Sequence, residues 1–290
     1  MAIRPRRSAL YMPGSNARAL EKARTLDTDV VILDLEDAVT PDMKAQARSL
    51  VVAAVQAGGF GRREVVIRVN ALESKWGEAD IAAVANSGAD AVLVPKVSSG
   101  GDVVIFARHL RAAGAPESLK VWAMMETPLA MLNAGAIAAT AADPATRLSA
   151  FIMGTNDLAK ETRARLLPGR AAMVPWLQTC LAAARAFGLD ILDGVYNALE
   201  DTAGFAAECA QGRDFGFDGK TLIHPNQLGI CNTTFSPSAG EVAMAREVIG
   251  VFDLPENADK GAVQLGGRMV ERLHADMARR VLAIADAIID

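Results

Sequence analysis

Eight short apolar runs recur between Ser8 and Ile223, and segments with helical spacing separate them. Strands that alternate with helices of this length predict a parallel sheet with right-handed crossovers. Eight such units favour a closed (β/α)₈ barrel, a TIM barrel, and 290 residues is a usual length for one. The runs are Ser8–Met12, Val30–Leu35, Glu64–Val69, Ala91–Val94, Val121–Met125, Ser149–Met153, Leu189–Val195 and Lys220–Ile223.

Polar side chains stand at the end of almost every run, and their positions favour the barrel over an open sheet. In a closed barrel all C-terminal strand ends converge on one mouth, which is where barrel active sites lie. In an open sheet the same residues would be spread along an edge. The residues are Asp34, Glu36, Asp37, Arg68, Asn70, Lys96, Glu126, Asn156, Asp157, Asn197 and His224.

After the eighth run the pattern changes. A helical segment over Ser238–Val251 fits the eighth barrel helix, so we expect a catalytic barrel domain over residues 1–252. A short strand-like run, Ala262–Leu265, and a final helix follow it. Residues 253–290 are too few for a separate domain. We expect them to form a short C-terminal lid or oligomerisation segment, over this barrel's mouth or a neighbour's.

Helix boundaries are also legible where a capping residue precedes a periodic segment. Ser15 predicts a helix that runs to Leu26. Asp201 or Thr202 predicts a helix that ends near Gly212.

The bulk numbers exclude several classes of protein. The formal net charge is -4 and the sequence pI is about 5.5, so nothing suggests a nucleic-acid or membrane surface. No run reaches the roughly 20 apolar residues of a membrane span, and the basic start has too few for a signal peptide. Cys180, Cys209 and Cys231 lack metal-site spacing, which predicts free thiols in a reducing cytoplasm.

Glu126 and Asp157 end the fifth and sixth runs, so a barrel would place them on adjacent strands. Pro128 stops the fifth strand just beyond Glu126, and a carboxylate at the exit of a buried strand is costly without a partner. Two carboxylates that leave positions for water and substrate suit Mg²⁺. The alternative is an ion pair with a base, and Lys96 at the end of the fourth run is available to Glu126.

Arg68 lies near the end of the third run, where a fixed guanidinium suits a substrate carboxylate or a developing oxyanion. Its alternative role is a structural ion pair with Asp34 or Glu36 across the barrel. We interpret Asp34, Glu36 and Asp37 as groups that orient Arg68, Lys96 or a metal-bound water, and not as direct metal ligands.

Arg18 and Lys22 lie four residues apart after the first run, so they share one face of a helix near its N-terminus. They are candidates to bind a phosphate-bearing ligand, and a solvated basic face explains them equally well. The neighbouring glycine makes no nucleotide fingerprint.

Seven short segments follow one another in the order found in one known family, over nearly the whole chain. They are Arg7–Ser15, Leu33–Val39, Ile67–Asn70, Val94–Lys96, Glu126–Pro128, Phe217–Lys220 and Ile223–Pro225. Together they resemble the citrate lyase β-subunit and malyl-CoA lyase family, the HpcH/HpaI aldolases. Because the likeness extends nearly end to end, it is more specific than any one motif.

The resemblance implies a (β/α)₈ barrel, Mg²⁺ and an acyl-CoA substrate. Carried over by position, Glu126 and Asp157 would be the metal ligands, and Glu126 would also face the substrate. Arg68 would bind substrate and act in catalysis, while Arg18 and Lys22 would lie toward coenzyme A. Such proteins are typically homotrimers or homohexamers in which the C-terminal segment covers a neighbour's site.

One departure from the family pattern lies in the C-terminal segment. Lyases of the family usually carry an aspartate after a Gly-x-Met-Val-like run, whereas Gly267–Val270 is followed here by Glu271. Together with Trp122–Thr127, Met153–Glu161 and Asp193–Ala198, this glutamate resembles the (3S)-malyl-CoA thioesterase branch. We therefore expect Mg²⁺-dependent hydrolysis of (3S)-malyl-CoA to malate and coenzyme A, with Glu271 as a catalytic residue that positions water.

Two other activities would use the same site and stay open. A malyl-CoA or citramalyl-CoA lyase would cleave a carbon–carbon bond and release acetyl-CoA with a 2-oxo acid. A citrate lyase β-subunit would act on an acyl-carrier thioester within a complex. A non-catalytic barrel would leave the many polar strand ends without a purpose.

Overall fold

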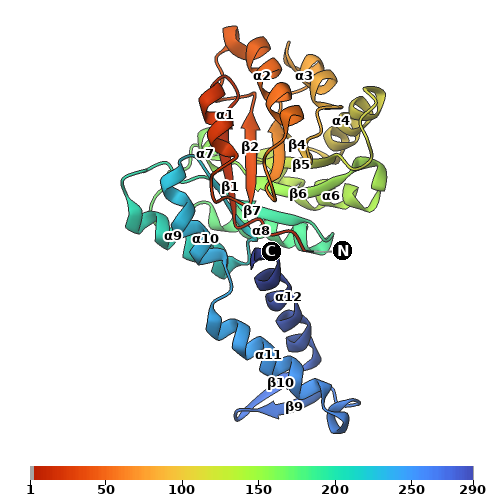
Figure 1. Cartoon of the computed structure of the whole chain (residues 1–290), viewed down its shortest axis with the longest axis vertical. Helices are drawn as coiled ribbons and strands as arrows, with labels where there is room; N and C mark the ends of the chain where they lie inside the picture. The colour runs from red at the N-terminus through yellow and green to blue at the C-terminus, as the bar shows by residue number, and fades with distance from the viewer. Residues whose placement is uncertain (1–2, 290) are drawn as a thin grey trace. The chain divides into compact units, whose positions relative to one another are not determined.

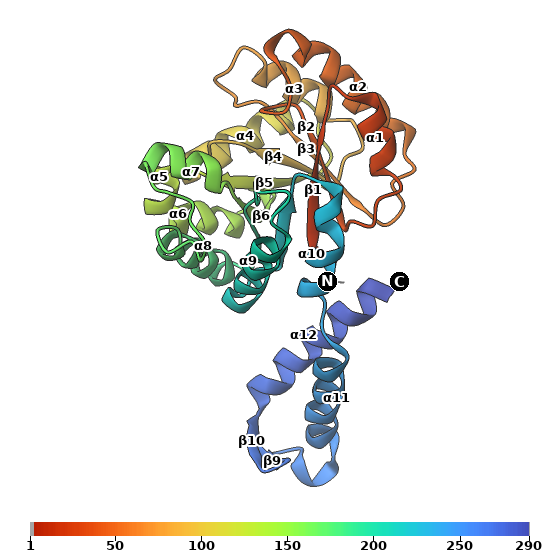
Figure 2. The same ribbon diagram turned by 90° about the vertical axis from the view of Figure 1, so that its left-hand side faces the viewer.

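Eight parallel strands close into a barrel in the computed structural model, which describes residues 3–289, and helices surround the barrel (Figures 1 and 2). The strands pair in chain order, and the last pairs with the first. They are β1 (Ser8–Pro13), β2 (Val30–Asp34), β3 (Glu64–Arg68), β4 (Ala91–Val94), β5 (Lys120–Met125), β6 (Leu148–Met153), β7 (Asp190–Asp193) and β8 (Gly219–Leu222). Each lies within two residues of its predicted run, which confirms the (β/α)₈ barrel.

Helices follow the strands on the outside of the barrel. They are α1 (Ala17–Ala23), α2 (Lys44–Ala57), α3 (Gly77–Val84), α4 (Gly100–Ala112), α5 (Pro128–Leu132), α6 (Ala134–Ala139), α7 (Thr155–Thr162), α8 (Val174–Ala186), α9 (Thr202–Phe215) and α10 (Leu228–Phe235). Asp201 caps α9 as predicted, but the helix ends at Phe215, three residues past the predicted Gly212. The prediction for α1 is wrong at both ends, because Asn16 caps it and Ala23 ends it. Asparagine caps as well as serine does, so adjacent candidates cannot be ranked.

Alternate strand residues point into the barrel and fill it, because side chains alternate between the two faces of a strand. The buried cluster contains Ala9, Val30, Ile32, Val66, Ala91, Leu93, Trp122, Met124, Ala150, Ile152 and Leu192. Asp34, Arg68 and Glu126 each lie two residues beyond a member of this cluster, so they point inward at the C-terminal end. The alternation that builds the core therefore also delivers these three side chains to the mouth.

A buried network of four charges joins the strands to the outer layer. Lys220 on β8 donates to Asp193 on β7 at 3.0 Å and to Glu208 on α9 at 2.7 Å. Arg170 donates to both Asp193 carboxylate oxygens, at 2.7 and 2.8 Å. Although burial raises the pKa of Asp193, the two cations lower it to below its ordinary value. Two positive and two negative groups balance, which permits burial of Lys220, Asp193 and Arg170 beside the partly buried Glu208.

Residues 3–5 and 233–289 form a second compact unit with its own apolar core. Helix α11 (Ala239–Asp253) packs on α12 (Arg272–Ile289), and the antiparallel strands β9 (Ala262–Leu265) and β10 (Arg268–Glu271) lie between them in sequence. The chain thus divides after Asn232 and not after residue 252. The segment expected as the eighth barrel helix belongs here, because its apolar residues meet those of α12.

Two expectations about the chain's environment concern residues that the structure describes. The three cysteines are buried free thiols, as predicted. None of the helices within residues 3–289 has both the length and the apolar character needed to cross a bilayer.

We predict that Lys220→Met destabilises the barrel by roughly 3–5 kcal/mol, because it leaves the buried Asp193 carboxylate short of one cation. The free energy of unfolding from urea titration measures this effect. As a control, Arg279→Met removes an exposed ion pair with Asp276 and should leave the unfolding midpoint unchanged. Equal midpoints for both variants would contradict a stabilising role for the network.

Candidate active site

Glu126 follows the last residue of β5 and its side chain is buried. One carboxylate oxygen, Oε1, accepts the backbone N–H of Lys96 at 2.8 Å. The other, Oε2, is buried and has no hydrogen-bond partner among residues 3–289. Burial raises the pKa of Glu126, and the nearby Lys96 offsets this only in part. A buried carboxylate oxygen without a donor is costly, so the site favours a cation beside Oε2.

Gly154 allows the end of β6 to approach Glu126 closely. A Cβ atom on Gly154 would lie 2.4 Å from Glu126 Cβ and 2.6 Å from Glu126 Oε2, closer than atoms can pack. No other residue fits at this position without a shift of the backbone. Helix α7 begins at the next residue, Thr155, so its first turn carries Asp157 past the same carboxylate.

Asp157 and Glu126 share a contact with one lysine. The Lys96 ammonium forms an ion pair with Asp157 Oδ1 and lies 3.6 Å from Glu126 Oε1. Lys96 has a left-handed backbone (φ 56°), which turns its N–H toward Glu126 while the side chain reaches both acids. The structure therefore brings Glu126, Asp157 and Lys96 together. This arrangement agrees both with the predicted shared cation and with the alternative ion pair with Lys96.

The two carboxylates fit the donor set that Mg²⁺ takes. No group of three or more His, Cys, Asp or Glu side chains with metal-site geometry occurs in the described part of the chain. Mg²⁺ does not require such a group, because it keeps several waters and binds through one or two carboxylates. The unpaired Glu126 Oε2, next to the partly exposed Asp157, is the kind of ligand pair it needs.

Arg68 is held by three acids at the end of β3. Its Nε and Nη2 donate to the two Asp34 oxygens at 2.7 and 2.6 Å, while Nη1 lies 2.9 Å from Glu36 and 3.3 Å from Asp37. Burial lowers the pKa of Arg68, but Asp34 raises it further, so the guanidinium stays charged. Burial raises the pKa of Glu36 to about 8. The acids predicted to orient Arg68 are therefore the same residues that form the structural ion pair given as its alternative role.

Sequence reasoning missed Tyr11 and Met124, which lie under Arg68. The Tyr11 ring centroid is 4.9 Å from the guanidinium carbon, and the Tyr11 hydroxyl is 3.9 Å from Met124 Sδ. Met124 Sδ is also 3.8 Å from Arg68 Nη1. Strand periodicity could have identified them, because Tyr11 and Met124 each lie two residues after a residue that points into the barrel.

The remaining predicted residues belong to other elements. Arg18 and Lys22 are exposed on α1, on one side of that helix as predicted. Glu271 ends β10 in the C-terminal unit, where its backbone N–H donates to His274 Nδ1 at 2.9 Å. Glu126, Asp157 and Arg68 therefore all come from the barrel, whereas Glu271 comes from the other unit.

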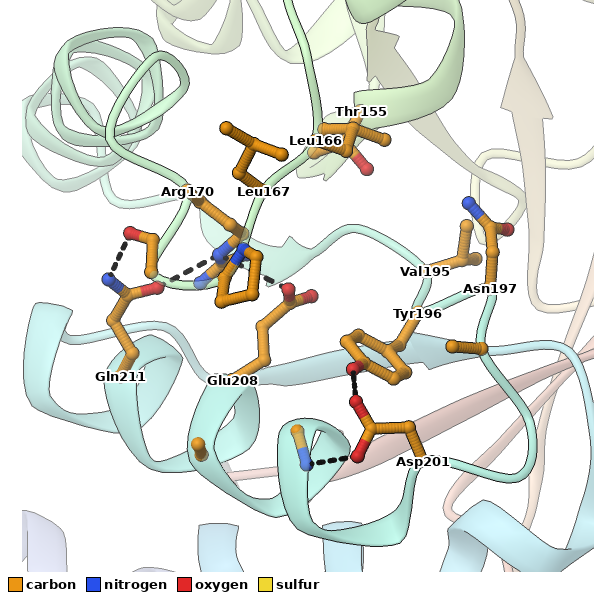
Figure 3. A pocket seen from close by; sticks show the side chains of 15 residues that line it. Thr155, Leu166, Leu167, Arg170, Val195, Tyr196, Asn197, Asp201, Glu208 and Gln211 are labelled. Carbon is orange, nitrogen blue, oxygen red and sulfur yellow. Dashed lines mark hydrogen bonds and ion pairs between the residues drawn. The ribbon is translucent and has the colours of Figure 1, made fainter.

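A pocket of about 330 Å³ lies beside the first turn of α7, between the loop before α8 and helix α9 (Figure 3). Thr155 lines it, and Asn197 exchanges side-chain hydrogen bonds of 2.7 and 3.2 Å with Asn156. Its polar side chains are largely paired already, as the Tyr196 hydroxyl is with Asp201 at 2.6 Å. One lining group, the buried Nη2 of Arg170, has no hydrogen-bond partner among the described residues, but the pocket's carboxylates are paired. The buried carboxylate oxygen without a donor is Glu126 Oε2.

The chain has close relatives among known proteins. It is 50% identical over 284 residues to a (3S)-malyl-CoA thioesterase of Cereibacter sphaeroides, which covers 98% of this chain and 96% of that protein. It is 34% identical to citrate lyase subunit beta of Escherichia coli, over 98% of this chain and 94% of that one.

Solved structures agree with these sequence matches. The crystal structure of CitE from Mycobacterium tuberculosis in complex with magnesium, acetoacetate and coenzyme A matches with a TM-score of 0.77 and 29% identity. That match covers 97% of this chain and 98% of the other. The family model for HpcH/HpaI aldolase/citrate lyase matches residues 7–225, which include Arg68, Glu126 and Asp157. The chain therefore belongs to the HpcH/HpaI aldolase/citrate lyase family.

Proposed function

We propose that this enzyme hydrolyses (3S)-malyl-CoA to malate and coenzyme A, with Mg²⁺ as its cofactor. The observation that carries the proposal is the 50% identity to a (3S)-malyl-CoA thioesterase along nearly the full length of both chains. The second candidate, carbon–carbon cleavage as in a malyl-CoA or citrate lyase, is supported by the more distant citrate lyase β-subunits at 34% identity.

Glu126 and Asp157 would hold the Mg²⁺. The unpaired Glu126 Oε2 supports this assignment, and so does the magnesium in the CitE complex. Bound there, the ion would supply a divalent positive charge beside the anionic malyl group. Asp34, Glu36 and Asp37 hold Arg68 and so would stay outside the set of ligands.

Arg68 would face the thioester oxygen. In hydrolysis, a water oxygen bonds to the thioester carbon and the carbonyl oxygen takes up negative charge. The carbon–sulfur bond then breaks, and the sulfur leaves as a thiolate that takes a proton. A guanidinium held rigidly by acids needs little reorganisation to stabilise this charge. Glu271 would position the water and accept its proton.

The rest of the substrate is long and anionic. Arg18 and Lys22 would bind the phosphates of coenzyme A, and the coenzyme A in the CitE complex supports a site of this kind in the fold. The C-terminal unit would bring Glu271 to a barrel mouth as a lid. We propose that the enzyme is cytoplasmic and that it is a homotrimer or homohexamer. Light scattering of the purified protein tests the oligomeric state.

The products of the reaction decide between the two candidate activities. We expect (3S)-malyl-CoA with Mg²⁺ to yield one free thiol and one malate per substrate consumed, and no glyoxylate. A thiol assay and chromatography of the acids measure both products. Removal of Mg²⁺ with EDTA should stop the reaction, and added Mg²⁺ should restore it. Release of glyoxylate with acetyl-CoA would establish lyase activity and sink the hydrolysis proposal.

Asp157→Asn should weaken Mg²⁺ binding and lower kcat by about 100-fold or more, because it removes a charged ligand from the ion. Calorimetric titration with Mg²⁺ measures binding independently of activity. Glu161→Gln is the matched control, since Glu161 is exposed on the same helix, α7. Unchanged Mg²⁺ affinity in Asp157→Asn would remove Asp157 from the metal site.

Glu271→Asp tests whether the extra methylene group matters for hydrolysis. The shorter side chain withdraws the carboxylate from the water, so we expect hydrolysis to fall at least tenfold with little change in KM. Glu256→Asp, an equivalent change at an exposed position of the same unit, should have no effect. Full hydrolytic activity in Glu271→Asp would rule out a role for the length of this side chain.

A further inference from the structure

We infer that Tyr11 is a further catalytic residue, whose hydroxyl donates a hydrogen bond to the same thioester oxygen that Arg68 faces. The inference deepens the proposed function and rests on it. Tyr11 would be a second donor to the developing oxyanion. The hydrogen bonds of Arg68, the position of the Tyr11 ring and the weak contact of the Tyr11 hydroxyl support this role.

Arg68 alone has few donors to offer a substrate. A guanidinium carries five N–H groups. Two of them donate to Asp34, one to Asp37 and one to the Met124 thioether. Glu36 Oε2 lies 2.9 Å from Nη1 as an ion pair without a hydrogen bond among the described residues. One N–H, on Nη2, is left for an oxyanion. Oxyanions in acyl transfer are usually stabilised by more than one donor, so a second group at the Arg68 guanidinium would complete the site.

Tyr11 lies where that second donor is needed. Its ring packs on the buried barrel core and stacks against the Arg68 guanidinium, with 4.9 Å between the ring centroid and Cζ. Its side chain points into the barrel yet keeps part of its surface accessible. Because buried residues fill the barrel below it, the accessible part faces the mouth.

The Tyr11 hydroxyl is poorly satisfied for such an enclosed phenol. Its hydrogen-bond contact among the described residues is Met124 Sδ at 3.9 Å, and a thioether is a weak acceptor. Met124 lies on β5, two residues before Glu126, so the hydroxyl reaches from β1 toward the proposed metal ligand. An acyl group that spans Arg68 and Glu126 would pass over it.

Toward an oxyanion the Tyr11 hydroxyl acts as a hydrogen-bond donor and not as an acid. Burial raises the pKa of Tyr11 well above its ordinary value, more than Arg68 lowers it. The phenol therefore keeps its proton throughout the reaction. It stabilises the oxyanion by a hydrogen bond, and no bond to it forms or breaks.

Tyr11→Phe removes the hydroxyl and keeps the ring under Arg68. We expect kcat for (3S)-malyl-CoA to fall by about 100-fold, as for the loss of one oxyanion donor, with KM nearly unchanged. Tyr196→Phe is the matched control, because Tyr196 is the chain's other tyrosine and its hydroxyl pairs with Asp201. It should keep kcat within about twofold. Both variants should fold, which the thermal unfolding midpoint checks.

A second measurement separates the thioester oxygen from other substrate oxygens. The thioether analogue of malyl-CoA has a methylene group in place of the carbonyl but keeps the hydroxyl and the carboxylate. Its Kd by calorimetry should be the same for the native protein and Tyr11→Phe. A fall in kcat of less than tenfold, or weaker binding of the thioether to Tyr11→Phe, would overturn the inference. If the native protein fails to hydrolyse malyl-CoA, the proposed function fails first.

Discussion

The carboxylate of Glu126, buried at the end of β5, is the constraint on which the active site depends. It stays in place because the Lys96 backbone binds one oxygen and because Gly154 leaves room for the other. A side chain at Gly154 would collide with the Glu126 side chain, so either this carboxylate or the end of β6, which leads into Asp157, would have to move. The position of the second carboxylate thus follows from the space required by the first.

The charges around this carboxylate explain why the mouth suits a divalent cation. Five acids (Asp34, Glu36, Asp37, Glu126 and Asp157) surround two bases, Arg68 and Lys96. A malyl group adds a further negative charge, which such a mouth would repel without more positive charge. Burial raises the pKa of Glu36 to about 8, and the neighbouring acids Asp37, Glu126 and Asp34 contribute to this rise. Binding of an anionic acyl group and of a cation are therefore coupled by charge.

The sequence predicted the parts of this site that depend on strand periodicity. Glu126 and Asp157 were paired correctly as neighbours because consecutive strands of a barrel are adjacent. Arg68 was placed at the mouth for the same reason. Tyr11 was missed, since the guanidinium that gives it meaning lies 57 residues later and no local pattern links the two positions. The special role of Gly154 likewise depends on Glu126, in a different strand.

Helix partners were harder to predict than strands. The spacing of apolar residues in α11 gave a helix at the right place, but an amphipathic helix does not state which core its apolar face joins. Here that face packs against α12, so the division of the chain falls about 20 residues earlier than expected. Ser15 and Asn16 show the same limit on a smaller scale, because both residue types cap helices.

The independence of the C-terminal core has a consequence for how such enzymes diverge. Position 271 ends one strand of a two-stranded hairpin, whereas the side chains around Glu126 are fixed by barrel packing. A substitution at position 271 therefore changes a residue of the C-terminal unit, whereas Arg68 and Glu126 are packed within the barrel. Under the proposed roles of these residues, a lineage would keep its recognition of the thioester while a change in one hairpin alters the reaction that follows. Differences in chemistry between relatives should then accumulate in this unit at little cost in stability to the barrel.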